Sequence, residues 1–201
     1  MRYQTTIIED WVKNFYYSID IYQPRQLDLE EIAARLGIIV HYKNFSSRVY
    51  DGEIILDKRL SLQQQWEDFG HELCHVLRHY GNQTYMTISF LDHQEAQANN
   101  FALHFCVPTF MLLRNEIINY LNIEDGITFV AETFNVTESF AKKRLLHFRN
   151  QLQQAESDKK FRLYMNRLYP KASPENWSEE TKSLLDKLNT QIEKKKTLQG
   201  V

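Results

Sequence analysis

The sequence predicts an α+β fold that is predominantly helical, with a small β-sheet packed beside a helix bundle and a helical C-terminal tail. Three observations lead to this prediction. Only six Gly and four Pro interrupt the 201 residues, so long helices can persist. Apolar residues recur at helical spacing in most segments. The clearest β-prone residues lie in one short stretch, residues 38–57, around the dipeptide Asp51-Gly52.

The composition is that of an ordinary globular protein. It is 43% hydrophobic and 25% charged, and its net charge of −2 is too balanced for a general nucleic-acid-binding protein. No apolar run approaches the roughly 18 residues of a membrane span. Charges interrupt residues 1–15 before the apolar core of a signal peptide could form. We therefore expect a cytoplasmic protein with no membrane contact and no direct nucleic-acid partner.

The first third of the chain is expected to hold two helices and then the strands. A helix is predicted over residues 5–20, where apolar residues recur at helical spacing. A short second helix would begin after the capping residue Asp28 and end at Gly37. A strand over 38–42 follows, and residues 46–57 are expected to form a β-hairpin because Asp-Gly favours a two-residue turn.

Helices are expected to dominate the remainder of the body. One would span residues 61–81, with an apolar stripe of period 3.6. The stretch 83–91 has β character. After it, Asp92 would start a helix that Pro108 ends, and residues 109–121 would continue as another helix.

The composition changes towards the C-terminus, which suggests two parts. Residues 1–154 are predicted to form the folded body, and residues 155–201 a charged helical extension rich in Lys, Glu and Gln. The extension still carries an apolar stripe at helical spacing, so we expect it to pack or to pair. The stripe consists of Leu184, Leu185, Leu188 and Ile192.

The strongest chemical signal lies in the helix over 61–81. Residues 71–75 read His-Glu-Leu-Cys-His, an HExxH motif. The i, i+4 spacing puts both histidines on one helix face, close enough to hold one Zn²⁺. Glu72 is then placed to take a proton from a zinc-bound water, whose pKa zinc lowers towards about 7. The alternative is an amphipathic helix whose histidines only face solvent, but the motif favours zinc.

A catalytic zinc ion of this kind needs a third protein ligand and one open position. The candidates are His79, His93, Glu95 and His104. His79 continues the i, i+4 series, but three ligands along one straight helix cannot converge on one ion. His104 lies about 180° around the predicted helix from Glu95, so at most one of the two can face the site. Glu95 suits a His₂Glu site, although it could instead belong to a helix cap that begins at Asp92.

Three small residues near the motif have structural interpretations. Cys74 and Cys106 lie in predicted helices, and we expect them to be small buried hydrophobic residues rather than thiolates. Gly70 in a helix interior costs about 1 kcal/mol relative to Ala, which indicates a tight contact with a second helix.

These segments together resemble the ImmA/IrrE family of metallopeptidases. The resemblance rests on HELCH, on YDGEIILD before it, and on EAQANNFALHFCVP and FNVTESFAKKRL after it, and it covers about residues 25–150. It implies a zincin-like helix bundle with one Zn²⁺ per chain, held by His71, His75 and Glu95, and Glu72 as general base. One departure is Cys74, because many members have Gly there.

The resemblance also implies a substrate. Members of the family typically cleave helix-turn-helix transcriptional repressors of phages, mobile elements or stress regulons, and cleavage switches genes on. We therefore predict a site-specific endopeptidase that inactivates such a repressor. Tyr80, Tyr85 and His93 are candidates for stabilising the oxyanion or lining the cleft. The sequence does not predict the oligomeric state.

Two other function classes remain open. A regulatory protein could keep the zinc and disable its repressor by binding without cutting. A DNA-binding regulator could use residues 126–150 as a helix-turn-helix, with Thr137 capping its second helix and the basic Lys142, Lys143 and Arg144 on that helix. The slightly acidic net charge disfavours the second class, and the resemblance makes residues 126–150 part of the peptidase fold.

Overall fold

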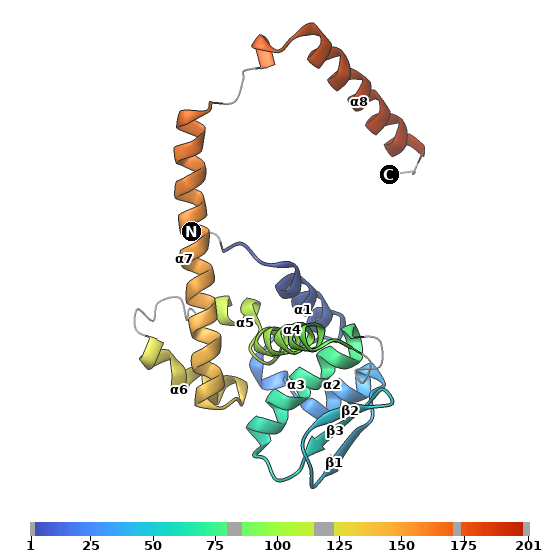
Figure 1. Ribbon diagram of the computed structural model, residues 1–201, viewed down its shortest axis with the longest axis vertical. Coiled ribbons are helices and arrows are strands. Elements are labelled where there is room, and N and C mark those ends of the chain that lie inside the picture. The colour runs from blue at the N-terminus through green and yellow to red at the C-terminus, as the bar shows by residue number, and fades with distance from the viewer. Residues whose placement is uncertain (1–2, 80–85, 115–122, 171–173, 199–201) are drawn as a thin grey trace. The chain divides into compact units, whose positions relative to one another are not determined.

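The computed structural model describes residues 3–79, 86–114, 123–170 and 174–198 (Figure 1). The helices in these residues are α1 (Ile7–Ser18), α2 (Leu29–Leu36), α3 (Leu62–Arg78), α4 (Ile88–Cys106), α5 (Thr109–Arg114), α6 (Ile123–Phe134), α7 (Glu138–Leu168) and α8 (Glu179–Leu198). The strands are β1 (Val40–Lys43), β2 (Arg48–Tyr50) and β3 (Glu53–Asp57), and short 3-10 turns lie at Pro24–Gln26 and Pro174–Asn176. The predicted fold class, α+β and predominantly helical, is confirmed.

The three strands form a mixed sheet with the order β1-β3-β2. β1 runs parallel to β3, and β2 runs antiparallel to β3, with Val40 and Val49 both opposite Ile54. Asp51 and Gly52 have φ angles of 51° and 78°, and two successive positive φ values are what a type I′ hairpin turn requires. The predicted hairpin is therefore confirmed, and β2 lies at the edge of the sheet.

Helix α3 occupies the centre of the body. It contacts β2 and β3 on one side and α4 on another, and α4 in turn contacts α1 (Figure 1). Large side chains fill the space between these layers, among them the fully buried Tyr16, Phe69 and Phe105. The Tyr16 hydroxyl donates a hydrogen bond of 2.9 Å to the carbonyl oxygen of Phe105, so this polar atom is buried with a partner.

Most of the predicted helix ends are confirmed by their caps. Asp28 caps α2 by accepting a hydrogen bond from the Glu31 amide, and Gly37 ends the helix in the left-handed conformation. α1 was predicted over residues 5–20 but runs from Ile7 to Ser18, and Thr6 caps it in a reciprocal capping box with Glu9. Thr137 accepts a hydrogen bond from the Phe140 amide at the start of α7.

The predictions for residues 83–91 and for the start of the next helix were wrong. α4 already begins at Ile88, with Thr87 as its N-cap, so the part of this stretch from residue 88 onward is helical. Asp92 therefore lies inside the helix and does not start it. Residues 83–85 lie outside the described residues. The β-branched residues that suggested β character cost less than about 1 kcal/mol each in a helix, so the local preference was weak.

Two other helix ends differ from the predictions, and the predicted end of the helix over 109–121 lies outside the described residues. α3 ends at Arg78, with His79 as its C-cap, and the predicted end at Gly81 lies outside the described residues. α5 is described only as far as Arg114. α7 continues past the predicted end at residue 150 to Leu168, because neither Gly nor Pro interrupts the sequence before Pro170.

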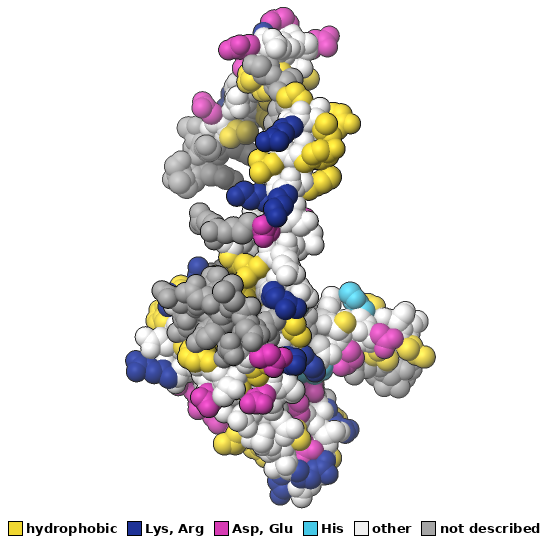
Figure 2. Space-filling view, turned by 90° about the vertical axis from the view of Figure 1, so that its left-hand side faces the viewer, with side chains coloured by type: hydrophobic (Ala, Val, Ile, Leu, Met, Phe, Trp, Pro, Cys, Tyr) yellow, Lys and Arg dark blue, Asp and Glu magenta, His cyan; other side chains and the backbone are white. Residues whose placement is uncertain are grey.

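Contacts between residues divide the chain into two units, residues 1–155 and residues 156–201, and the boundary falls inside α7. The second unit exposes large apolar side chains, some of which are visible in Figure 2. They are Phe161, Leu163, Tyr164, Leu168 and Tyr169 near the end of α7, and Leu184, Leu188 and Ile192 on α8. Among the described residues, no helix is both long and apolar enough to cross a membrane.

Candidate metal centre

Three metal-ligating side chains converge between α3 and α4. His71 and His75 come from successive turns of α3, and Glu95 comes from α4. His71 Nε2 lies 3.2 Å from Glu95 Oε2, His75 Nε2 lies 3.4 Å from Glu95 Oε1, and the two Nε2 atoms lie 3.2 Å apart. One ligand atom from each residue can be chosen so that all three lie within 4.8 Å of one another.

The donor set fits a catalytic zinc ion. Ligands at the usual zinc distances around a tetrahedral ion are about 3.3 Å from one another, close to the separations observed here. Two imidazoles and a carboxylate are also a common set for a catalytic zinc, which leaves a fourth position for water or substrate. The site is open on the side of Glu95, whose side chain is 52% exposed, whereas that of His75 is only 9% exposed.

A close contact between α3 and α4 positions this site. A Cβ atom on Gly70 would lie 2.7 Å from Cys106 Sγ and 3.5 Å from the Cα atom of Ala102. Only a glycine lets the two helices approach this closely with Cys106 in place. The expected tight contact at Gly70 is therefore confirmed, and it lies one residue before the first histidine of the motif.

Glu72 lies beside the ligands, and the pKa of its carboxyl group is higher than the ordinary value of a glutamate. Burial, followed by the nearby carboxylates of Asp68 and Glu95, raises the pKa of Glu72 to about 7. The backbone of Val49 on β2 interacts with this carboxylate and opposes the shift in its pKa. A divalent cation at the site would favour the ionised form and lower this pKa. A carboxylate that exchanges its proton near neutral pH is suited to general base catalysis.

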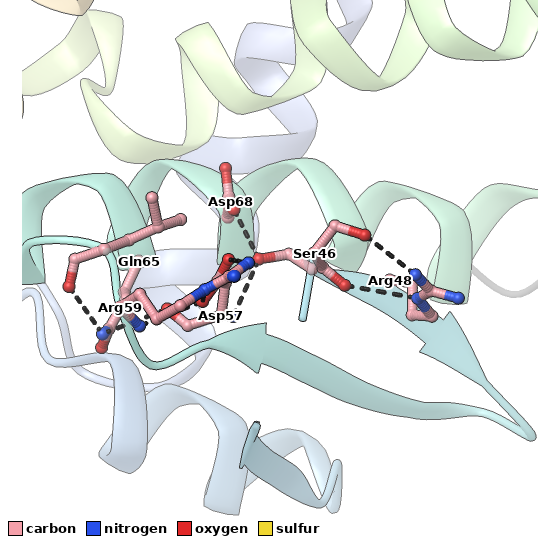
Figure 3. A network of polar contacts seen from close by, with 8 residues as sticks. Ser46, Arg48, Asp57, Arg59, Gln65 and Asp68 are labelled. Atoms are coloured by element: carbon pink, nitrogen blue, oxygen red, sulfur yellow. Dashed lines mark hydrogen bonds and ion pairs between the residues drawn. The ribbon is translucent and has the colours of Figure 1, made fainter. Parts of the chain in front are cut away.

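A polar network joins the strands to α3 through Asp57, Gln65 and Asp68 (Figure 3). The Ser47 hydroxyl donates a hydrogen bond to Asp68 and accepts one from the Asp57 amide. Two nitrogens of the Arg59 guanidinium bind the Asp57 carboxylate, and these contacts hold the pKa of Asp57 at about 2. Gln65 of α3 donates to the Asp57 carbonyl oxygen. These contacts fix β2 and β3 against the helix that carries the motif.

The structure keeps the other candidate ligands out of the ligand set. His79 contacts the opposite nitrogen of His75, with 2.9 Å between the two Nδ1 atoms. His93 is exposed and contacts Gln97. His104 is buried elsewhere, with Nδ1 3.7 Å from Glu9 Oε1 and its ring against that of His147. Tyr80 and Tyr85, the other two oxyanion candidates, lie outside the described residues.

Both cysteines are buried, as expected. Burial raises the pKa of the Cys74 thiol to about 11 and that of the Cys106 thiol well above its ordinary value, so neither forms a thiolate at neutral pH. Arg144 is also fully buried, with Nε donating to the Val107 carbonyl oxygen and Nη2 to the Thr109 hydroxyl. In this fold Arg144 therefore anchors α7 and is not available to contact a nucleic acid.

Comparison with known protein families matches residues 33–146 to the IrrE N-terminal-like domain, Peptidase_M78. The chain belongs to this family. The Peptidase_M78 match includes both helices of the candidate site, and the family name indicates a metallopeptidase. The resemblance inferred from the motifs is therefore confirmed.

Two proteins of Bacillus subtilis (strain 168) are similar to this Peptidase_M78 member. The phage-like element PBSX protein XkdA is 41% identical over 172 residues, which cover 84% of this chain and 86% of the relative. The uncharacterized protein YqaB is 41% identical over 160 residues, which cover 77% of this chain and 91% of the relative. This Peptidase_M78 chain is thus a homologue of a protein from a phage-like element.

Sequence reasoning missed three contributors to the site. Asp68 precedes Glu72 by four residues, a spacing that places both on one side of α3, so its influence on Glu72 was visible in the sequence. The Val49 backbone and the Gln97 side chain carried no such signal. Their roles depend on how β2 and α4 pack against α3, and sequence spacing does not encode this packing.

Proposed function

We propose that this protein is a zinc-dependent, site-specific endopeptidase that cleaves and inactivates a helix-turn-helix transcriptional repressor of a phage or mobile element, and so derepresses its genes. The observation that carries the proposal is the convergence of His71, His75 and Glu95 with a carboxylate of raised pKa beside them. Membership of Peptidase_M78 and the similarity to a protein of a phage-like element support it.

The residues of the site divide the chemistry between binding and proton transfer. His71, His75 and Glu95 would hold the zinc ion. When bound, zinc supplies Lewis acidity, which eases ionisation of a water molecule and polarises a peptide carbonyl group. Glu72 would accept a proton from the attacking water and later donate it to the leaving amine. Burial and the nearby Asp68 carboxylate keep the pKa of Glu72 high, and the backbone of Val49 lies against the same carboxylate.

The edge strand beside the site suits an extended peptide. β2 is the outer strand of the sheet, and on its other side it has no strand partner within the described residues. The contact between Val49 and Glu72 places this strand next to the candidate base. Extended segments bind such edges by adding a strand. A flexible segment of a repressor could therefore lie along β2 with one peptide bond near Glu72.

The test is cleavage of a purified helix-turn-helix repressor from the same genetic element, in the presence of zinc. We expect two fragments with one new N-terminus, identified by mass spectrometry. Glu72→Gln should bind zinc as the wild type does but yield no fragments. Glu132→Gln, an exposed glutamate on α6, is the matched control and should cleave normally. A stable, uncut complex with the wild-type protein would instead favour inactivation by binding, and cleavage by Glu72→Gln would exclude Glu72 as the base.

A further inference from the structure

A line of hydrogen bonds leads away from the ligand set on the side opposite the metal position. It begins at His75, whose Nδ1 lies 2.9 Å from Nδ1 of His79. His79 Nε2 lies 3.1 Å from Oε1 of Gln97 on α4. Gln97 Nε2 lies 2.9 Å from Nε2 of His93, one turn earlier on α4. The proposed mechanism gives no role to His79, Gln97 or His93.

With His79 neutral, the line has one consistent direction of hydrogen-bond donation. The Gln97 oxygen can only accept, so His79 Nε2 carries the proton and donates it. In a neutral His79 the other nitrogen, Nδ1, is then an acceptor. His75 Nδ1 must therefore carry a proton and donate it to His79. The Gln97 amide nitrogen donates in turn to His93 Nε2.

This direction decides the state of the His75 nitrogen that faces the ligands. A neutral histidine carries one ring proton, so a proton on Nδ1 leaves Nε2 with a free lone pair. His75 Nε2 is the atom that lies 3.4 Å from Glu95 and 3.2 Å from His71. The tautomer set by His79 is thus the one that can bind a metal ion at this position.

We propose that His79 is a positioning residue that holds His75 in the Nδ1-protonated tautomer, with its Nε2 lone pair directed to the metal position, and that Gln97 supports this role by orienting His79. The proposal rests on the metal site of the proposed function. His79 does not join the ligand set, because it binds the far side of a ligand that belongs to the set.

The hydrogen bonds of the line differ in solvent exposure, and we therefore expect them to contribute unequally to holding the His75 tautomer. The contact between His75 and His79 is partly buried, so water competes weakly for it. The contacts of Gln97 with His79 and His93 are exposed, and water can replace them. Removal of the His79 ring nitrogens should therefore have a larger effect than removal of the Gln97 amide.

The first test measures the tautomer in the metal-free protein. Side-chain ¹⁵N chemical shifts of His75, recorded near pH 8, distinguish a proton on Nδ1 from one on Nε2. We expect Nδ1 to be protonated in the wild type and in His79→Asn, because the Asn oxygen can accept at the position of Nδ1. In His79→Phe, which keeps an aromatic ring but has no acceptor, the two tautomers should mix. A wild-type protein with Nε2 protonated overturns the proposal.

The second test measures zinc affinity by competition with a chelator. Removal of such an outer partner typically weakens metal binding by about 10–100-fold, and we expect this for His79→Phe. His79→Asn should recover most of the loss, and Gln97→Leu should lose only a few-fold. The control is His41→Phe, which removes a histidine that pairs with Glu53 and should leave the affinity unchanged.

The outcomes separate this proposal from the proposed function. If the wild type binds no zinc, the proposed function fails, while the tautomer of His75 is still measured in the metal-free protein. If the wild type binds zinc but His79→Phe changes neither the affinity nor the His75 shifts, only the role of His79 is overturned.

Discussion

At the scale of single residues, the candidate site depends on one carboxylate from a second helix. His71 and His75 follow from the spacing of the motif, whereas Glu95 reaches them only because α4 packs against α3. Glu95 also supplies the negative charge of the ligand set. Its removal should therefore affect the metal more than any change at the rejected candidates.

We expect Glu95→Ala to weaken zinc binding by more than about 100-fold, because it removes a charged ligand of the ion itself. The loss of a residue that only contacts a ligand typically weakens metal binding by about 10–100-fold. Zinc per chain after dialysis measures this, and the wild type should retain about one ion. His104→Ala is the comparison, because His104 lies away from the site, and it should also retain about one ion. Equal zinc content in the wild type and Glu95→Ala would remove Glu95 from the ligand set.

His104 should make stability depend on pH. Burial and the nearby Arg144 hold the pKa of His104 well below its ordinary value, although Glu9 opposes this shift. The unfolded chain therefore binds the proton more readily, and the folded state loses stability as pH falls below about 6.5. Burial lowers the pKa of the adjacent His147 in the same direction.

His104→Phe keeps an aromatic ring beside His147 but cannot bind a proton. Between pH 7.5 and pH 5, urea unfolding should show that the wild type loses more stability than this variant, by on the order of 1 kcal/mol. The same loss in both proteins would show that His104 is not the group responsible.

Sequence reasoning identified most of these residues but not their surroundings. The relative position of the two HExxH histidines could be predicted, because residues i and i+4 of any α-helix lie on the same face. Glu95 was harder, because its place depends on the true start of α4 at Ile88. His75 and His79 have the same i, i+4 spacing. Spacing alone could not decide whether His79 is a third metal ligand or a hydrogen-bond partner of the ligand His75.

At the scale of elements, the packing of α3 on α4 carries the site. Gly70 lies at the closest approach, where Cys106 Sγ occupies the space that a methyl group would need. Glycine normally destabilises a helix interior, so Gly70 lowers the intrinsic stability of α3 while it allows this close contact. The two helices that supply the ligands are thereby held at a fixed separation.

We expect Gly70→Ala to lower the free energy of unfolding by about 1–3 kcal/mol, because overpacking outweighs the gain in helix propensity. Cys106→Ala in the same chain should restore part of the loss, since it removes the sulfur atom that the new methyl group meets. Denaturant unfolding of the two single variants and the double variant measures the coupling. A stabilised Gly70→Ala protein would show that the helices separate without cost.

Local signals predicted the elements best where the chain turns. The caps at Asp28, Gly37 and Thr137 and the Asp51-Gly52 turn were readable because each depends on a few neighbouring residues. The start of α4 was misread because the local β preference over 83–91 is small compared with the burial of later residues of α4, such as Ala98 and Phe101. Tertiary packing decided that element, and the sequence pattern alone does not contain it.

At the scale of the whole molecule, a bound metal ion would connect α3 to α4 in addition to their apolar contact. Unfolding separates the ligands, so a ligand that binds only the folded state stabilises it. Free zinc at 100 times its dissociation constant should add about 2.7 kcal/mol to the free energy of unfolding. Thermal unfolding should thus shift upward with zinc and return with a chelator, and Glu95→Ala should show no such shift.

The chemistry of the ligand set also determines how the protein would respond to oxidants. Two imidazoles and a carboxylate contain no sulfur, and both thiols of the chain are buried and protonated at neutral pH. Peroxide attacks thiolates first, and it releases zinc from sites in which cysteine is a ligand. If the site holds zinc as proposed, the ion should stay bound at peroxide concentrations that release zinc from sites with cysteine ligands.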